Sequence, residues 1–150
     1  MKQITTEVAM KEFGQRLGQL LRGGEVIELI GDVGAGKTTF TKGLAIGMDI
    51  AEVIQSPSFT ISRTYENAES IRMVHYDFYR LHDAGVMKQD LQESIEDNKT
   101  VTVVEWADIV SGVLPDDRLS LRFTSPTETS RSVDIEAGGV RSRQLKEELA

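Results

Sequence analysis

One eight-residue segment restricts the fold of this chain more than any other. Residues 31–38 read GDVGAGKT, which matches the pattern G-x-x-x-x-G-K-[ST] in full. The apolar residues 26–30 come directly before this segment, and apolar residues at helical spacing follow it. In that context the pattern is typical of a loop that binds phosphate groups between a β-strand and an α-helix.

Each residue type in this segment has a chemical reason to be there. Glycines at positions 31, 34 and 36 allow successive backbone N–H groups to point at phosphate oxygens, and the following helix adds the positive end of its dipole. We expect Lys37 to reach the β- and γ-phosphates and Thr38 to bind Mg²⁺ through its hydroxyl. Thr39 is either a contact of the α-phosphate or an ordinary helix residue. The predicted phosphate-binding set is Gly34, Ala35, Gly36, Lys37, Thr38 and Thr39.

Two acidic residues at predicted strand ends are candidates for the rest of a magnesium site. Glu105 follows the apolar residues 101–104, and Asp77 follows residues 71–76. Phosphate-loop proteins hold Mg²⁺ with an acid in this position. One carboxylate could hold the metal through a water while the other orients the attacking water, and the sequence leaves the assignment open. Each could instead be a helix-capping or ion-paired acid. The predicted catalytic residues are Lys37, Asp77 and Glu105, and the predicted metal ligands are Thr38, Glu105 and Asp77.

The apolar periodicity predicts an α/β fold with a mixed sheet, formed by a single domain over residues 1–150. Helices are expected from Thr6, directly after the glycine-rich segment, and over residues 83–97 and 141–149. Strands are expected over residues 26–30, 59–65, 71–76, 101–104, 119–123 and 132–135. The second and third of these strands are predicted to pair as a hairpin.

Three residues oppose the elements in which they are predicted to lie. Gly14 and Gly18 each weaken the first helix by up to about 1 kcal/mol, so packing must hold that helix. Glu28 interrupts a strand that would be wholly apolar if both faces of the sheet were covered.

Composition limits the cofactors and partners. The chain has no Cys and two His, which excludes thiolate metal sites and disulfides and argues against zinc. With 17 basic and 24 acidic residues the formal net charge is −7, which argues against a protein that grips RNA alone. No segment approaches the roughly 18–20 apolar residues of a membrane span, so we expect a cytoplasmic protein without membrane contact.

The nucleotide and the reaction class can be narrowed by what the sequence lacks. GTPases recognise guanine with the motif N-K-x-D. The nearest segment here, residues 98–101, reads NKTV and lacks the Asp, which argues against guanine specificity. Small-molecule kinases usually bring several arginines to the transferred group, and the middle of this chain has only Arg63, Arg72 and Arg80. A small-molecule kinase and a nucleotide-gated binding module remain as alternatives to an ATPase.

Five motifs in series, over about residues 4–136, resemble the bacterial TsaE (YjeE) family. They are residues 31–40 (GDVGAGKTTF), 56–60 (SPSFT), 75–80 (HYDFYR), 104–106 (VEW) and 113–116 (VLPD). The resemblance implies a phosphate-loop NTPase domain whose central parallel sheet is extended by antiparallel strands, with helices on both faces. It also implies an ATPase that uses ATP and Mg²⁺ and works with TsaB- and TsaD-like proteins. That assembly forms N6-threonylcarbamoyladenosine in tRNA, which this subunit would meet only through the complex.

The same resemblance implies roles for further residues. Lys37, Thr38, Asp77, Glu105 and Trp106 match family positions that are tied to nucleotide, metal and activity. Thr60 lies in a segment that resembles a switch loop sensing the γ-phosphate, and Thr6 and Arg131 resemble positions that line the base pocket. From the residues alone, Thr60 could equally be an ordinary strand residue and Trp106 a core residue.

Overall fold

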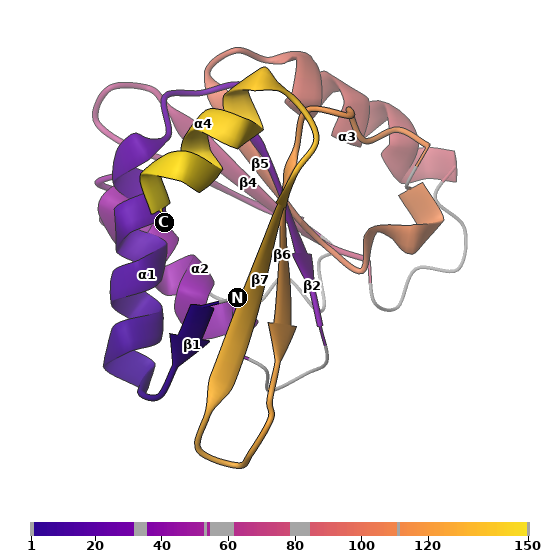
Figure 1. Ribbon diagram of the computed structural model, residues 1–150. Coiled ribbons are helices and arrows are strands. Elements are labelled where there is room, and N and C mark those ends of the chain that lie inside the picture. Colours follow the sequence, from indigo (N-terminus) through magenta and orange to yellow (C-terminus); the bar gives the residue numbers. More distant parts are fainter. Residues whose placement is uncertain are drawn as a thin grey trace.

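A seven-stranded mixed sheet forms the centre of the computed structural model, which describes residues 2–31, 36–52, 54, 62–78, 85–110 and 112–149 (Figure 1). The strand order is β1-β7-β6-β2-β5-β4-β3. The strands are β1 (Lys2–Ile4), β2 (Val26–Ile30), β3 (Ser62–Glu66), β4 (Arg72–Asp77), β5 (Thr100–Glu105), β6 (Leu119–Thr124) and β7 (Arg131–Ala137). Strand β2 therefore lies in the middle of the sheet.

The middle of the sheet is parallel and both of its edges are antiparallel. Strand β2 pairs in parallel with β5 and β6, and β5 pairs in parallel with β4. Antiparallel pairs β3–β4, β6–β7 and β1–β7 extend the sheet on either side. The predicted α/β fold, the mixed sheet and the β3–β4 hairpin are confirmed. Because neighbouring parallel strands finish at the same end of the sheet, the carboxyl ends of β2, β4 and β5 lie together.

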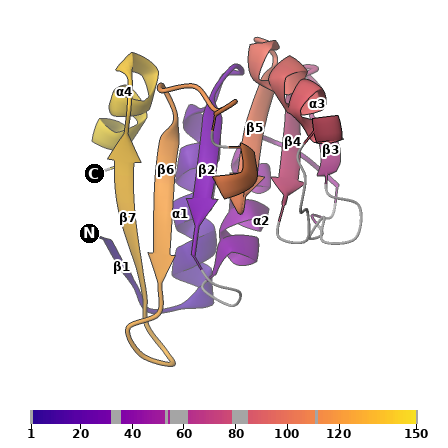
Figure 2. The same ribbon diagram turned by 90° about the vertical axis from the view of Figure 1, so that its right-hand side faces the viewer.

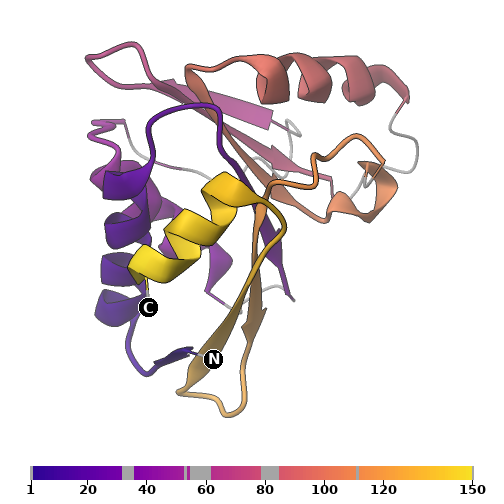
Figure 3. The same ribbon diagram turned by 45° about the horizontal axis from the view of Figure 1, so that its top comes forward.

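Helices cover both faces of the sheet. They are α1 (Glu7–Leu20), α2 (Lys37–Gly47), α3 (Gly85–Glu96), the short 3₁₀ helix η1 (Ala107–Val110) and α4 (Val140–Leu149). Helices α1, α2 and α4 pack on one face, and α3 and η1 lie on the other (Figures 2 and 3). No helix in the described part of the chain is long and apolar enough to cross a membrane.

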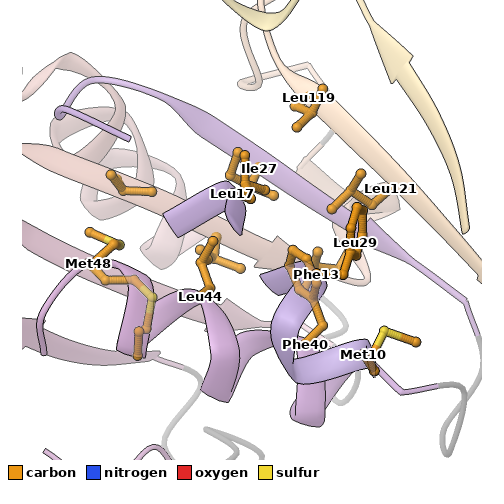
Figure 4. Packing of buried hydrophobic residues seen from close by; sticks show 14 of the residues in the cluster. Met10, Phe13, Leu17, Ile27, Leu29, Phe40, Leu44, Met48, Leu119 and Leu121 are labelled. Carbon is orange, nitrogen blue, oxygen red and sulfur yellow. The ribbon is translucent and has the colours of Figure 1, made fainter. Parts of the chain in front are cut away.

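The larger part of the core lies between the sheet and the helices α1 and α2. Phe13, Leu17, Phe40 and Leu44 on the helices pack against alternate residues of the central strands, such as Leu29 (Figure 4). The rings of Phe13 and Phe40 are 5.6 Å apart between centroids. Alternation along β2 sends Ile27 and Leu29 into this core and Glu28 to the opposite face.

Glu28 is accommodated by polar partners on that opposite face. It accepts hydrogen bonds from Arg118 Nε at 3.0 Å and from the Ser120 hydroxyl at 2.9 Å. Ser120 is the register partner of Glu28 on β6. The acid that interrupts the apolar strand is therefore paired and hydrogen-bonded, as a partly buried charge must be.

The two glycines of α1 allow the backbone of α2 to approach closely. A Cβ atom on Gly14 would lie 2.2 Å from the carbonyl oxygen of Phe40, and one on Gly18 would lie 2.2 Å from that of Leu44. The loss of helix propensity at these two glycines is thus offset by the packing of α1 against α2.

The glycines of α2 complete the same interface. A Cβ on Gly43 would lie 2.0 Å from the carbonyl oxygen of Lys11, and one on Gly47 would lie 2.2 Å from that of Gln15. The contacting positions rise together along both helices, so α1 and α2 run parallel. Their amino-terminal ends therefore lie at the same end of the pair.

Most predicted elements are present, with small shifts at their ends. Strand β1 and helix η1 were not predicted, because a three-residue strand and a four-residue 3₁₀ helix carry too little periodicity to detect. Residues 59–61, predicted to begin a strand, lie outside the described residues.

The helix interface makes a quantitative prediction. Gly14→Ala should lower the free energy of unfolding by about 1–3 kcal/mol, because overpacking against backbone outweighs the gain of up to about 1 kcal/mol in helix propensity. Gly112→Ala is the matched control, since a Cβ there meets nothing within 4 Å. Urea unfolding followed by circular dichroism measures both variants. A Gly14→Ala protein as stable as the parent would contradict the close approach of the two helices.

Candidate functional site

The side chain of Lys37 lies at the centre of the candidate site. Helix α2 begins at Lys37, and the preceding Gly36 has a left-handed φ of 102°. The ammonium donates a hydrogen bond to the carbonyl oxygen of Gly31 at 2.6 Å and lies 3.5 Å from Glu105 Oε1. It also lies 4.6 Å from the ring centroid of Trp106. Lys37, only 5% exposed, therefore connects the carboxyl ends of β2 and β5.

Glu105 is a buried carboxylate with partners on both oxygens. It is the last residue of β5 and is 6% exposed. Its Oε2 lies 2.6 Å from Nε2 of His75, while Oε1 faces Lys37. Burial favours the neutral acid, but the hydrogen bond with His75 and the charge of Lys37 outweigh it, so the pKa of Glu105 lies below its ordinary value. The carboxylate is therefore held charged inside the protein.

Asp77 lies beside Glu105 on the neighbouring strand. The two residues are register partners at the ends of the parallel strands β4 and β5. Side chains in register on adjacent parallel strands share a face of the sheet. His75, two residues before Asp77, shares that face, which is the one covered by α1 and α2. The two predicted carboxylates thus lie side by side at the carboxyl ends of β4 and β5, as expected from their strand-end positions.

The donor set fits a magnesium ion better than a metal held only by protein. Among the described residues, no group of three or more His, Asp or Glu side chains is arranged to hold a metal ion. Mg²⁺ usually binds through one or two carboxylates, with phosphate oxygens and waters as the other ligands. A buried charged Glu105, a neighbouring Asp77 and the exposed Thr38 in the first turn of α2 suit that requirement.

A separate pocket combines the two residues expected to line the base pocket, Thr6 and Arg131, with residues of the predicted phosphate-binding set. Thr6, Gly36, Thr39 and Arg131 line a hollow of about 270 Å³ beside the amino-terminal ends of α1 and α2. Thr6 is the N-cap of α1, and its hydroxyl accepts a hydrogen bond from the Ala9 backbone at 3.0 Å. The parallel packing of α1 and α2 is what brings Thr6 next to the start of α2.

Arg131 is held against the turn between β6 and β7. One of its terminal nitrogens donates to the carbonyl oxygens of Thr127, Glu128 and Ser130, at 3.4, 3.3 and 2.9 Å. Glu128 and Thr129 from the same turn also line the pocket. This turn therefore forms one wall of the hollow, and Arg131 fixes its carbonyl groups in place.

Trp106 lies at the boundary between the site and a second hollow. Its φ of +56° is unusual for a bulky residue and marks a sharp change of direction after β5. The half-buried ring packs against the smaller group of buried residues on the α3 face of the sheet, which includes Val104 and Val110, and also contacts Lys37. On its other side it lines a cleft of about 570 Å³ together with Gly31 and Arg122. Trp106 is thus both a core contact and a site residue, which the sequence alone could not separate.

The structure groups the predicted residues into two neighbouring sets. Lys37, Glu105 and Trp106 are in contact and Asp77 is in register with Glu105, whereas Thr6, Gly36, Thr39 and Arg131 line the pocket. Gly34, Ala35 and Thr60 lie outside the described residues. The contact of His75 with Glu105 was not predicted. Strand alternation could have found it, since His75 precedes Asp77 by two residues.

These features define a class of protein. The chain is an α/β protein with a mixed seven-stranded sheet, in which a phosphate-loop sequence joins the central strand β2 to α2. A lysine at the start of that helix meets a charged acid at the end of the adjacent parallel strand.

Comparison with known proteins identifies the family. The family model described as "Threonylcarbamoyl adenosine biosynthesis protein TsaE" matches residues 4–133. A tRNA threonylcarbamoyladenosine biosynthesis protein TsaE from Streptomyces coelicolor is 40% identical over 115 residues, covering 76% of this chain and 78% of the relative. The protein of that name from Bacillus subtilis is 35% identical over 155 residues, covering 100% of this chain and 96% of the relative. The chain belongs to the TsaE family of tRNA threonylcarbamoyladenosine biosynthesis proteins.

A solved structure agrees with this result. The crystal structure of YdiB from Bacillus subtilis matches with a TM-score of 0.81 and 30% sequence identity, covering 99% of this chain and 91% of that chain. The family that the sequence motifs resembled is therefore confirmed, and so is the fold.

The lowered pKa of Glu105 makes stability depend on pH. A carboxylate whose pKa is lower in the folded chain stabilises the fold above its unfolded pKa, near 4.5, and loses this effect as the pH falls through the folded pKa. Glu105→Gln should therefore be less stable than the parent at pH 7, by about 1–3 kcal/mol. The difference should shrink steadily below pH 4.5.

Urea unfolding between pH 3 and pH 7 measures this difference. The exposed Glu136→Gln is the control and should stay within about 0.5 kcal/mol of the parent at every pH. A Glu105→Gln deficit that does not change with pH would show that the charge of this carboxylate does not stabilise the fold.

Proposed function

We propose that this protein is a Mg²⁺-dependent ATPase that acts with TsaB- and TsaD-like proteins in forming N6-threonylcarbamoyladenosine in tRNA. The observation that carries the proposal is the contact between the Lys37 ammonium, at the start of α2, and the Glu105 carboxylate, at the end of β5. A phosphate-loop lysine and a strand-end acid are two of the groups that phosphate-loop NTPases use in phosphoryl transfer. Membership of the TsaE family supports the pathway.

Phosphate binding would replace one of the present partners of Lys37. The ammonium would give up its hydrogen bond to the carbonyl oxygen of Gly31 and donate to a β- or γ-phosphate oxygen bound at the amino-terminal end of α2. The amino-terminal end of a helix carries a partial positive charge and N–H groups without partners inside the helix, which favour an anion. The base would then occupy the pocket lined by Thr6 and Arg131.

The remaining residues would hold the metal and the attacking water. Thr38, Asp77 and Glu105 are the proposed Mg²⁺ ligands, directly or through water, and a bound Mg²⁺ neutralises charge on the transferred phosphoryl group. A carboxylate that does not bind the metal directly would orient a water toward the γ-phosphorus. When that water attacks, its oxygen would form the new bond to phosphorus, and the bond to the ADP oxygen would break with its electron pair leaving on ADP. The proton that the water loses would pass to an oxygen of the phosphate product or to the orienting carboxylate.

Protein partners complete the proposal. A net charge of −7 is unfavourable for direct contact with tRNA phosphates, so the tRNA would be held by TsaB- and TsaD-like proteins. Groups supplied by a partner accelerate other phosphate-loop enzymes by positioning water and charge. We therefore expect slow ATP hydrolysis by the isolated protein and faster hydrolysis in the complex.

Replacement of Lys37 tests the proposal directly. Lys37→Ala should lower ATP turnover by on the order of 10²-fold, because one preorganised cation is lost from the transition state. Lys42→Ala is the matched control, since Lys42 is exposed on the same helix and should keep full turnover. Phosphate release is measured with each protein alone and with the purified TsaB- and TsaD-like proteins.

Two results would count against the proposal. Equal turnover by the parent and Lys37→Ala proteins would remove the phosphate loop from the reaction. Turnover that rises with an added small metabolite, which itself gains phosphate, and not with the partner proteins would indicate a kinase instead.

A further inference from the structure

Among the residues that the structure describes, His75 is the most deeply buried titratable side chain in contact with the candidate site. It lies on β4 and is 2% exposed. Its Nε2 is 2.6 Å from Oε2 of Glu105, while Lys37 lies near the other oxygen of the same carboxylate. The carboxylate is thus held from two sides by groups on two different elements.

The direction of the His75 hydrogen bond follows from its partner. A carboxylate accepts hydrogen bonds and cannot donate them, so the hydrogen is assigned to Nε2 of His75. The other ring nitrogen, Nδ1, is buried and has no hydrogen-bond partner among the described residues. The contact with Glu105 is therefore the one described hydrogen bond that orients this ring.

We propose that His75 is a positioning residue for Glu105, an inference that rests on the proposed ATPase function. Its Nε2–H fixes Oε2 and so directs Oε1 toward Lys37 and the phosphate end of the site. When Lys37 turns to a phosphate group, His75 remains as the fixed donor to this buried carboxylate. The ring thereby keeps Glu105 in one orientation through the reaction, as partners of metal-binding carboxylates do in other sites.

Two amide variants of equal polarity test the position of the donor. The amide of Gln can reach the place of Nε2, whereas the amide of Asn ends near the place of Nδ1. His75→Asn should lower kcat for ATP hydrolysis by roughly 10- to 100-fold. His75→Gln should recover most of that loss. The KM for ATP should change less than about threefold in both variants, because neither touches the phosphate-binding groups.

A control on β5, the strand that carries Glu105, separates positioning from folding. Thr102 lies on β5, on the opposite face from Glu105, and its hydroxyl is 2.8 Å from the Ser94 hydroxyl in a buried contact. Thr102→Val removes that hydrogen bond with little change of shape. Thr102→Val should lower the melting temperature without changing kcat. If kcat falls in His75→Asn but not in Thr102→Val, the loss cannot be ascribed to weaker folding.

Two readouts do not depend on ATP turnover. Trp106 is the chain's one tryptophan and lies beside Lys37, so its fluorescence should report binding of a non-hydrolysable ATP analogue, with equal Kd in parent and His75→Asn proteins. The chain has two histidines, so nitrogen NMR can resolve the ring of His75 once His82→Gln assigns the other. We expect the ring of His75 to carry its hydrogen on Nε2 in the parent protein. In Glu105→Ala, the preference of the ring for this form should be lost.

The outcomes distinguish this inference from the function on which it rests. No turnover by the parent protein with its partners would overturn the ATPase proposal and the role of His75 together. Turnover in the parent with an unchanged kcat in His75→Asn would overturn only the role of His75. An equal defect in the Gln and Asn variants, or an Nδ1–H form in the NMR spectrum, would also contradict it.

Discussion

The backbone contact between α1 and α2 is the constraint on which the site depends. Glycines at four positions let the two helices meet without intervening side chains, and the helices run parallel as a result of that register. Their amino-terminal ends therefore lie together, one carrying Thr6 and the other Gly36 and Lys37. A side chain at any of these glycines would separate the helices and move the start of α2 away from the ends of β2 and β5.

The second constraint is electrostatic. Glu105 and Lys37 are both buried, and burial of a charge is costly unless partners replace water. His75 and the carbonyl oxygen of Gly31 supply those partners, so the pair is satisfied within the protein. Replacing a whole buried pair by apolar residues often changes stability little, whereas removing one partner leaves a buried charge unpaired and is costly. The pair also holds two reactive groups in fixed positions. That is the property a phosphate site needs, because its groups must be in place before charge develops.

Sequence patterns predicted the elements and the strand-end acids well, because both depend on local periodicity. Local periodicity predicted three features: helix α2 after strand β2, the acid Glu105 at the end of β5, and the hairpin of β3 and β4. The sequence did not predict where Gly14 and Gly18 pack, the pairing of Glu28 with Arg118, or the contact of His75 with Glu105. These features join residues 26 to 90 positions apart, so local spacing does not identify both partners. Strand alternation indicates only that His75 shares a face of the sheet with Asp77. Trp106 was ambiguous because one ring meets both the core and Lys37.

We propose that the Lys37–Glu105 site supplies an activity that threonylcarbamoyladenosine formation requires. The most direct measurement is a nucleoside analysis of tRNA from cells depleted of this protein and complemented with the parent chain, Glu105→Ala or the exposed-site control Lys42→Ala. We expect N6-threonylcarbamoyladenosine to disappear on depletion and to return with the parent and Lys42→Ala chains but not with Glu105→Ala. Normal levels in the depleted cells, or full restoration by Glu105→Ala, would contradict it.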